Sequence, residues 1–295
     1  MSITASSKEQ QPPSPTPSRS STLPSSLNMQ AKRRQRRQTF LIHGGRIFLL
    51  VVILVVWQSI SGRLVNPLFI SSPLGVVTQA IAWIQDGSLW YHTEITLQET
   101  LLGLFFGVIS GIVLALLLGP QQVLGEILDP FIIAIYSIPK VALAPLFLLW
   151  FGIDLQMKVI LAAVTVFFLV FFNTLAGVRN VDQNLIDAVR LMGGKPRDIM
   201  FKVIIPSASG YMLVGLHIAI PYALIGAVIA ELVASNRGLG YLIDASAAEY
   251  NTSGVFVALL VLTLIAGILN AIVGFIDRKT SQWKAVMRTG NQQAP

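Results

Sequence analysis

"DAVRLMGGKPRDIMFKVIIP" spans residues 187–206 and lies between two long apolar stretches of the sequence. It is charged and has a Gly-Gly break near its middle, at Gly193 and Gly194. The residues that lead into the break recur at helical spacing, which predicts a short amphipathic helix over residues 184–192. Its predicted apolar face consists of Leu185, Ile186, Val189 and Met192.

The break itself predicts how this helix ends. Gly193 readily adopts the left-handed conformation that closes a helix, and Asp187 is expected in the first turn of the same helix, where its charge favours the helix dipole. Pro196 suits the first turn of a second helix, and Pro206 marks its end or a kink. We therefore expect a helix–turn–helix whose apolar side faces outward, a shape suited to insertion into a groove of a partner.

The rest of the chain has the composition of a membrane protein. Apolar residues make up 54% of the sequence and charged residues 12%, whereas a soluble domain averages about 25% charged. The apolar residues fall in blocks long enough to cross a hydrocarbon core of ~30 Å, without the alternation of a β-barrel. The predicted fold class is an all-α membrane protein with six spans, at residues 46–62, 95–119, 128–151, 157–177, 207–230 and 253–276.

The distribution of charge predicts how the chain lies in the membrane. With the N-terminus inside, 17 of the 21 Lys and Arg fall on the inner side, which follows the positive-inside rule. Both termini and the loop 178–206 are then expected to be cytoplasmic, in a multi-pass protein of the bacterial inner membrane. The basic run "KRRQRR" (32–37) precedes the first span and is expected to contact anionic lipids rather than nucleic acid.

We predict three regions. Residues 1–45 form a disordered basic cytoplasmic tail, because the Ser- and Pro-rich start cannot bury enough apolar surface to order itself. Residues 46–284 form the membrane domain, and residues 285–295 form a second cytoplasmic tail. Within the membrane domain, Gly103, Gly107 and Gly111 recur at a spacing of four, which indicates either close helix packing or a hinge.

Enzymatic and metal-binding functions find no support in the sequence. It has no cysteine, and its histidines, His43, His92 and His217, are too far apart to suggest a metal site. No set of residues shows the spacing of a catalytic site, and no phosphate-binding loop of the G-x-x-x-x-G-K-[ST] type is present.

The loop resembles the "EAA" loop of ATP-binding-cassette importer permeases. That motif has an acidic residue, two alanines, a glycine four residues after the second alanine, and a Leu-Pro about a dozen residues later. Here it reads Asp187-Ala188-Val189, Gly193 and Ile205-Pro206. The stretches "IPKVALAPLFLLWFGI" (138–153), "FFNTLAGVRNVD" (171–182) and "AELVASNRGLGYLI" (230–243) resemble the nitrate, sulfonate and taurine branch of this family, over roughly residues 66–284.

The resemblance implies a mechanism and partners. Such permeases have the type I importer fold, form dimers, here expected to be homodimers, and dock the loop on ABC ATPase subunits. ATP and Mg²⁺ bind those ATPases, so no cofactor is expected on this chain. A separate extracytoplasmic binding protein delivers the substrate, expected to be a small organic or inorganic anion or a heterocycle. The residues assigned to ATPase coupling are Leu185, Ile186, Asp187, Ala188, Val189, Met192, Gly193 and Pro206.

A few polar or kinked positions inside the spans are candidates for the translocation pathway: Tyr136, Pro139, Lys140, His217 and Glu231. A lysine in a bilayer is expected to face a cavity, to reach the headgroups, or to pair with an acid such as Asp129. His217 is expected to be buried and hydrogen bonded or to line the pathway, and Glu231 to cap the outer end of a span. The alternative to a permease is a stand-alone carrier or channel, which would not need the charged loop.

Overall fold

The computed structural model describes residues 25–290 and is almost entirely helical. It divides into two units, residues 1–56 and 57–295, and the second contains nearly all the helices. The helices are α1 (Ser25–Ile60), α2 (Pro67–Ile70), α3 (Pro73–Gln85), α4 (Ser88–Leu118), α5 (Gln122–Tyr136), the 3₁₀ helix η1 (Lys140–Leu143), α6 (Ala144–Phe151), α7 (Leu155–Arg179), α8 (Gln183–Leu191), α9 (Pro196–Ile199), the π-helix η2 (Met200–Ile204), α10 (Ile205–Ala234), α11 (Leu239–Ala248) and α12 (Thr252–Gly290).

Four helical segments among the described residues are long and apolar enough to cross a membrane. They are α4, α7, the continuous run of α9, η2 and α10 over Pro196–Ala234, and α12 up to Phe275. An uninterrupted helix satisfies its backbone hydrogen bonds internally, as lipid requires. The predicted first span corresponds to a shorter apolar segment, Gly44–Ile60, at the end of α1.

The predicted span over residues 128–151 differs most from the structure. There α5 and the pair formed by η1 and α6 meet at an angle of 79°, so the segment is a broken span or a re-entrant loop rather than one straight helix. The break is at Ser137-Ile138-Pro139, because a residue that precedes proline is disfavoured in the helical conformation.

Two helices extend into the predicted tails. Helix α1 begins at Ser25, within the region predicted as the N-terminal tail, and α12 continues to Gly290, within the region predicted as the C-terminal tail. Residues 1–24 and 291–295 lie outside the described residues, as do the side chains of the basic run at 32–37 with its predicted lipid contacts.

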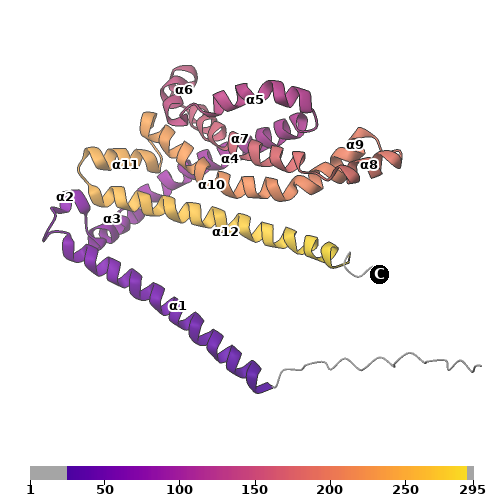
Figure 1. Cartoon of the computed structure of the whole chain (residues 1–295). Coiled ribbons are helices and arrows are strands. Elements are labelled where there is room, and N and C mark those ends of the chain that lie inside the picture. The colour runs from indigo at the N-terminus through magenta and orange to yellow at the C-terminus, as the bar shows by residue number, and fades with distance from the viewer. Residues whose placement is uncertain (1–24, 291–295) are drawn as a thin grey trace, which may run out of the picture. The chain divides into compact units, whose positions relative to one another are not determined.

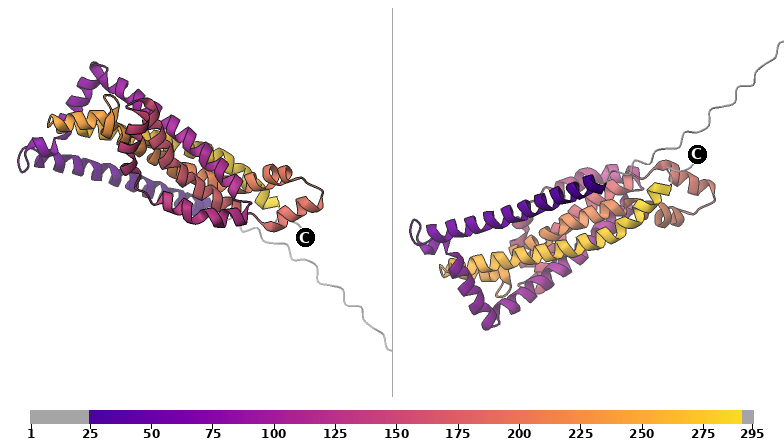
Figure 2. Two further views of the ribbon diagram at one scale, coloured as in Figure 1. Left: turned by 90° about the horizontal axis from the view of Figure 1, so that it is seen from above. Right: turned by 90° about the horizontal axis from the view of Figure 1, so that it is seen from below.

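Helix α7 is the centre of the second unit and packs along both α4 and α10 (Figures 1 and 2). Half of its apolar stretch is buried, against 22–39% for the other three long segments. Because α4 and α7 approach very closely at the three spaced glycines, the predicted close packing is confirmed. A Cβ atom added at Gly103 would lie 2.4 Å from the Ala162 Cβ, and one added at Gly107 would lie 2.6 Å from the Ala163 carbonyl oxygen.

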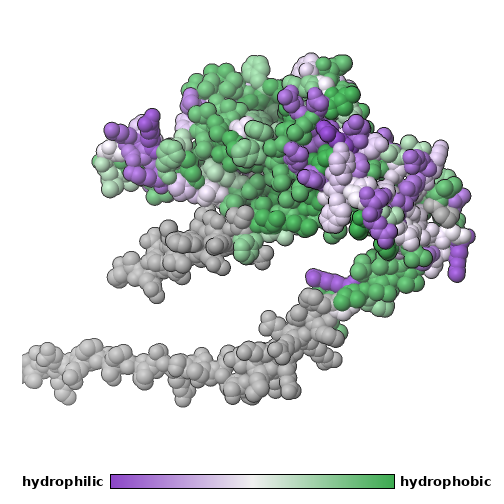
Figure 3. Space-filling view, turned by 180° about the vertical axis from the view of Figure 1, so that it is seen from behind, coloured by the Kyte–Doolittle hydropathy of each residue, from purple (hydrophilic) through white to green (hydrophobic). Residues whose placement is uncertain are grey.

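The polar parts of this unit lie at its two ends. Helices α8 and α9 lie at one end, and α11 lies at the other (Figures 1 and 2). In the space-filling view, hydrophobic residues cover the middle of the unit and hydrophilic residues gather toward these ends (Figure 3). This is the distribution expected of a unit whose middle contacts lipid.

Candidate functional site: the loop between α7 and α10 and the cavity at the helix break

The loop between α7 and α10 folds as the sequence predicts, with a helix, a glycine turn and a second helix. Helix α8 starts after Asp182, whose side chain accepts a hydrogen bond from the Asn184 N–H at 2.9 Å. It ends in a Schellman motif, because the Gly194 N–H donates to the Val189 carbonyl and the Gly193 N–H donates to the Arg190 carbonyl, both at 2.9 Å. Gly193 has φ +79°, so the predicted left-handed cap is confirmed.

The second helix of the loop continues into the membrane. It begins at Pro196, as predicted, with the Asp198 carboxylate accepting from the Lys195 N–H at 3.0 Å. Pro206 does not end it. The π-helix η2 precedes this proline, and its wider turn accommodates a residue that has no N–H to donate. The loop is therefore joined to α10 without interruption.

Two details of α8 differ from the prediction. Asp187 is not in the first turn, which holds no acidic residue, but bonds to the exposed side chain of Arg190 at 3.2 Å. The apolar residues do not form one outward face either. Ile186 and Val189 pack against a cluster where the loop meets the membrane helices, whereas Leu185, Leu191 and Met192 are exposed.

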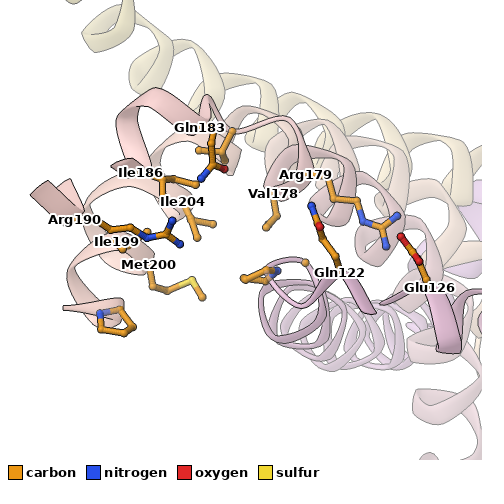
Figure 4. Close-up of a pocket in the computed structure, with 14 residues that line it drawn as sticks. Gln122, Glu126, Val178, Arg179, Gln183, Ile186, Arg190, Ile199, Met200 and Ile204 are labelled. Atoms are coloured by element: carbon orange, nitrogen blue, oxygen red, sulfur yellow. The ribbon is translucent and has the colours of Figure 1, made fainter. Parts of the chain in front are cut away.

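That cluster ties the loop to the membrane helices. Its buried members are Val178 at the end of α7, Ile199 of α9, Ile204 of η2 and Ala208 of α10. Beside it lies a cavity of about 630 Å³ between the loop, the start of α5 and the end of α7. Gln183, Ile186 and Arg190 border it from α8, and Arg179 and Glu126 point toward one another across its far side (Figure 4).

The predicted pathway residues fall into two groups. Tyr136, Pro139 and Lys140 line a second cavity, of about 450 Å³, where α5 breaks from η1, and α7 and α10 form the rest of its wall. His217 and Glu231 do not line this cavity. The His217 Nδ1 lies 3.0 Å from the Leu213 carbonyl oxygen, and this side chain is partly buried rather than fully buried.

Glu231 belongs to a buried polar cluster that ties the α10–α11 turn to α4. It is 1% exposed, so it is not a cap at the membrane surface. Its carboxylate accepts from the Thr96 hydroxyl at 2.7 Å and from the Gly240 N–H at 2.5 Å.

Next to Glu231, Lys158 of α7 pairs with Glu99 of α4 at 2.8 Å, and the two side chains are each 1% exposed. Lys158 also donates to the Ser235 hydroxyl at 2.7 Å. This pair was not predicted from the sequence, because the partners are separated by 59 residues. Two opposite charges inside neighbouring spans were the only signal available.

Comparison with known proteins identifies the family. Residues 103–282 match the family described as "Binding-protein-dependent transport system inner membrane component". The chain belongs to this family. It is a transport subunit of the ABC transporter permease type and not an enzyme, and it is a multi-pass component of the inner membrane.

Relatives of this permease transport chemically different solutes according to their names. It is 31% identical over 239 residues to the putative aliphatic sulfonates transport permease of Bacillus subtilis (strain 168), covering 81% of this chain and 87% of that one. It is 31% identical over 220 residues to the formylaminopyrimidine transport permease of Halalkalibacterium halodurans, covering 74% and 87%.

A solved structure shares the fold. The methionine ABC transporter MetNI in an inward-facing conformation matches with a TM-score of 0.55 and 21% sequence identity, over 67% of this chain and 96% of that chain. The type I importer fold predicted for the membrane domain is thereby confirmed.

Proposed function

We propose that this permease moves a small solute inward and is driven by separate ATPase subunits that bind its α8–α9 loop. The observation that carries the proposal is the exposed apolar tip of that loop. Leu185 is 51% exposed, Leu191 89% and Met192 86%. Large apolar side chains that cluster on a short helix outside the lipid can insert into an apolar groove of a partner.

The contacts of the loop can transmit a movement of α8 to the membrane helices. Its inner face packs against the ends of α7 and α10 through Ile186, Val189, Ile199 and Ile204, and α9 runs into α10 without a gap. Displacement of α8 by a partner would therefore move α7 and α10. Because both helices line the cavity at the α5 break, their movement supports alternation between inward-open and outward-open states.

The proposal includes further partners. The family supports the binding protein and the ATPase subunits, whereas the lipid contact rests on the charge of residues 32–37. A binding protein delivers the solute from outside, and ATP and Mg²⁺ act on the ATPase subunits. A second copy of the chain completes the pathway as a homodimer, and the basic run near the N-terminus holds anionic lipid. The named relatives transport sulfonates and a formylaminopyrimidine, which supports a small organic anion or a heterocycle as the solute.

Co-purification of an ATPase subunit with the tagged permease tests this proposal. The double variant Leu191→Asp/Met192→Asp places charges on the apolar tip and should lose most of the bound ATPase and the hydrolysis stimulated by the binding protein. Leu64→Asp is the matched control, since Leu64 is 81% exposed but lies outside the loop. Unchanged attachment and uptake in the double variant would show that the ATPase does not dock on this tip, and a wild-type permease that transports without any co-purifying ATPase would favour a stand-alone carrier.

A further inference from the structure

The cavity at the α5 break has walls from three parts of the chain. The break contributes Tyr136, Pro139 and Lys140, and α7 contributes Leu161, Thr165 and Leu169. Helix α10 contributes Tyr222, Ile225, Gly226 and Ile229. Thr165 and Ile225 lie well inside their helices rather than at the ends, so the cavity lies at the depth of the membrane, and it is partly open to the surface of the chain. Its volume of about 450 Å³ is in the range of small-molecule sites.

Lys140 brings a positive charge to this cavity. Its ammonium donates to the carbonyl oxygens of Tyr136 and Ile138, the second at 3.0 Å. It also lies 4.6 Å from the centroid of the Tyr136 ring and 4.9 Å from that of Phe168. An ammonium group has three hydrogens to donate, so two carbonyl bonds leave one for a further acceptor.

The contrast with Lys158 shows what Lys140 lacks. Lys158 is paired with the Glu99 carboxylate at 2.8 Å. Lys140 forms no ion pair with any described residue, Asp129 included, and no carboxylate is present among the described residues that line the cavity. A lysine at this depth in a membrane protein marks a functional site by default, and its missing partner is an anion.

The rest of the wall indicates the shape of that anion. Apart from Lys140, the lining consists mainly of aliphatic side chains and two tyrosines, Tyr136 and Tyr222, which are 41% and 44% exposed. A small inorganic anion would leave this apolar surface unoccupied. An organic anion would place its charge at the ammonium and its apolar body against the tyrosine rings and Ile225.

We propose that this cavity binds a small monovalent organic oxyanion, a carboxylate or a sulfonate, with its charged group on Lys140. The assignment of the cavity to the transport route rests on the function proposed above. The binding itself does not, because it can be measured on the purified permease. The inference narrows the solute from anions and heterocycles in general to organic anions with a compact apolar body.

Protection of a single cysteine tests the proposal, since the chain has no native cysteine. Ile225→Cys, a lining position that is 48% exposed, is labelled with N-ethylmaleimide in lipid nanodiscs with or without benzenesulfonate. Benzenesulfonate should slow labelling, whereas methyl phenyl sulfone, a neutral molecule of nearly the same shape, should not. Leu191→Cys in α8 should be labelled at the same rate throughout.

The role of Lys140 is tested in the same assay. Lys140→Met in the Ile225→Cys background should raise the half-protecting concentration of benzenesulfonate about tenfold or more, as expected when one charge-assisted hydrogen bond is lost. Lys140→Arg keeps the charge and should retain most of the protection. Three outcomes would each overturn the proposal. The sulfone could protect as well as benzenesulfonate does, or benzenesulfonate could protect the Lys140→Met variant as well as its parent. The third outcome is that neither reagent slows labelling of the cysteine at position 225.

The same preparations separate this proposal from the function on which its transport role rests. If ATPase co-purification is intact but benzenesulfonate gives no protection, the cavity assignment is wrong and the importer function stands. If protection depends on Lys140 but no ATPase binds the wild-type permease, the anion site stands and the ATP-driven function is wrong.

Discussion

Three ionisable side chains, Glu99, Lys158 and Glu231, are each 1% exposed in the part of the chain that crosses the membrane. Taking a charge out of water is expensive, and partners offset the cost only when their geometry is good. Lys158 meets this condition with a carboxylate at 2.8 Å and a hydroxyl at 2.7 Å. The pair therefore fixes the start of α7 against α4 and against the turn that follows α10.

Loss of one partner from this pair should be more damaging than loss of both. Lys158→Met leaves the Glu99 carboxylate buried and unpaired, and should lower the free energy of unfolding by about 3–5 kcal/mol. The measurement is the temperature at which the detergent-solubilised permease loses its monodisperse elution peak.

The double variant Glu99→Gln/Lys158→Met provides the comparison for this test. It removes both charges and should recover part of the lost stability, because the two effects are coupled. A double variant less stable than Lys158→Met would show that the two residues act independently.

The left-handed turn at Gly193 gives a second prediction at this scale. A Cβ atom at this position would meet nothing within 4 Å, so substitution acts only through the backbone conformation at φ +79°. Gly193→Val should strain or refold the turn, at about 1–3 kcal/mol, whereas Gly193→Asn should be tolerated better. The expected result for Val is normal membrane insertion with weaker ATPase co-purification and weaker stimulated hydrolysis.

Equal ATPase attachment in the Val and Asn variants would show that the turn geometry does not govern docking. The neighbouring Gly194 is a less informative position. A Cβ atom there would lie 2.5 Å from the Val189 Cγ1, so substitution combines a clash with any effect on the backbone.

At the scale of elements, the close contact between α4 and α7 gives a prediction about helix packing. Gly107→Leu would place its Cβ atom 2.6 Å from the Ala163 carbonyl oxygen and 2.7 Å from the Val166 Cβ. Backbone atoms cannot move aside easily, so overpacking should lower stability by about 1–3 kcal/mol or more. Gly267→Leu in α12 is the control, since nothing lies within 4 Å of a Cβ at that glycine.

The expected outcome is a lower thermal stability and a lower yield for Gly107→Leu only. Similar losses in both variants would mean that leucine is poorly tolerated wherever a glycine is replaced in these helices. In that case the close contact between α4 and α7 would not explain the spacing of four.

The helices also show which parts of the fold could be predicted from the sequence and which could not. The spans at α4, α7, α10 and α12 could be predicted, because each is a long apolar run without interruption. The break after Tyr136 was not predicted, because the average hydropathy of a segment is the same whether its helix is straight or bent. Pro139 and the adjacent Lys140 were the signals of a break in the sequence. Helices α3 and α11 have only 13 and 10 residues and lie in connecting segments, so they gave no span signal.

The candidate site divides in the same way. The glycine turn and the start at Pro196 could be predicted, because local backbone preferences decide them. Which face of α8 points inward could not, since Ile186 and Val189 pack against α7, α9 and α10, and these contacts exist only in the folded chain. The pairing of Glu99 with Lys158 has the same origin.

At the scale of the whole molecule, the loop can bind a cytoplasmic ATPase only if its end of the bundle faces the cytoplasm. The distribution of charge supports this, because 17 of 21 Lys and Arg fall on the inner side in the predicted six-span topology. The structure places α8–α9 and the α11–α12 turn at opposite ends of the second unit (Figures 1 and 2). A probe that cannot cross the membrane should therefore distinguish the two ends.

Single cysteines provide that test without background, because the chain has none of its own. Tyr250→Cys replaces a side chain that is 73% exposed at the α11–α12 turn, and an impermeant maleimide should label it in intact spheroplasts. Lys195→Cys, in the exposed turn before α9, should be labelled only after the membrane is permeabilised. Labelling of position 195 but not of position 250 in intact spheroplasts would reverse the orientation, and the loop could then not dock on a cytoplasmic ATPase.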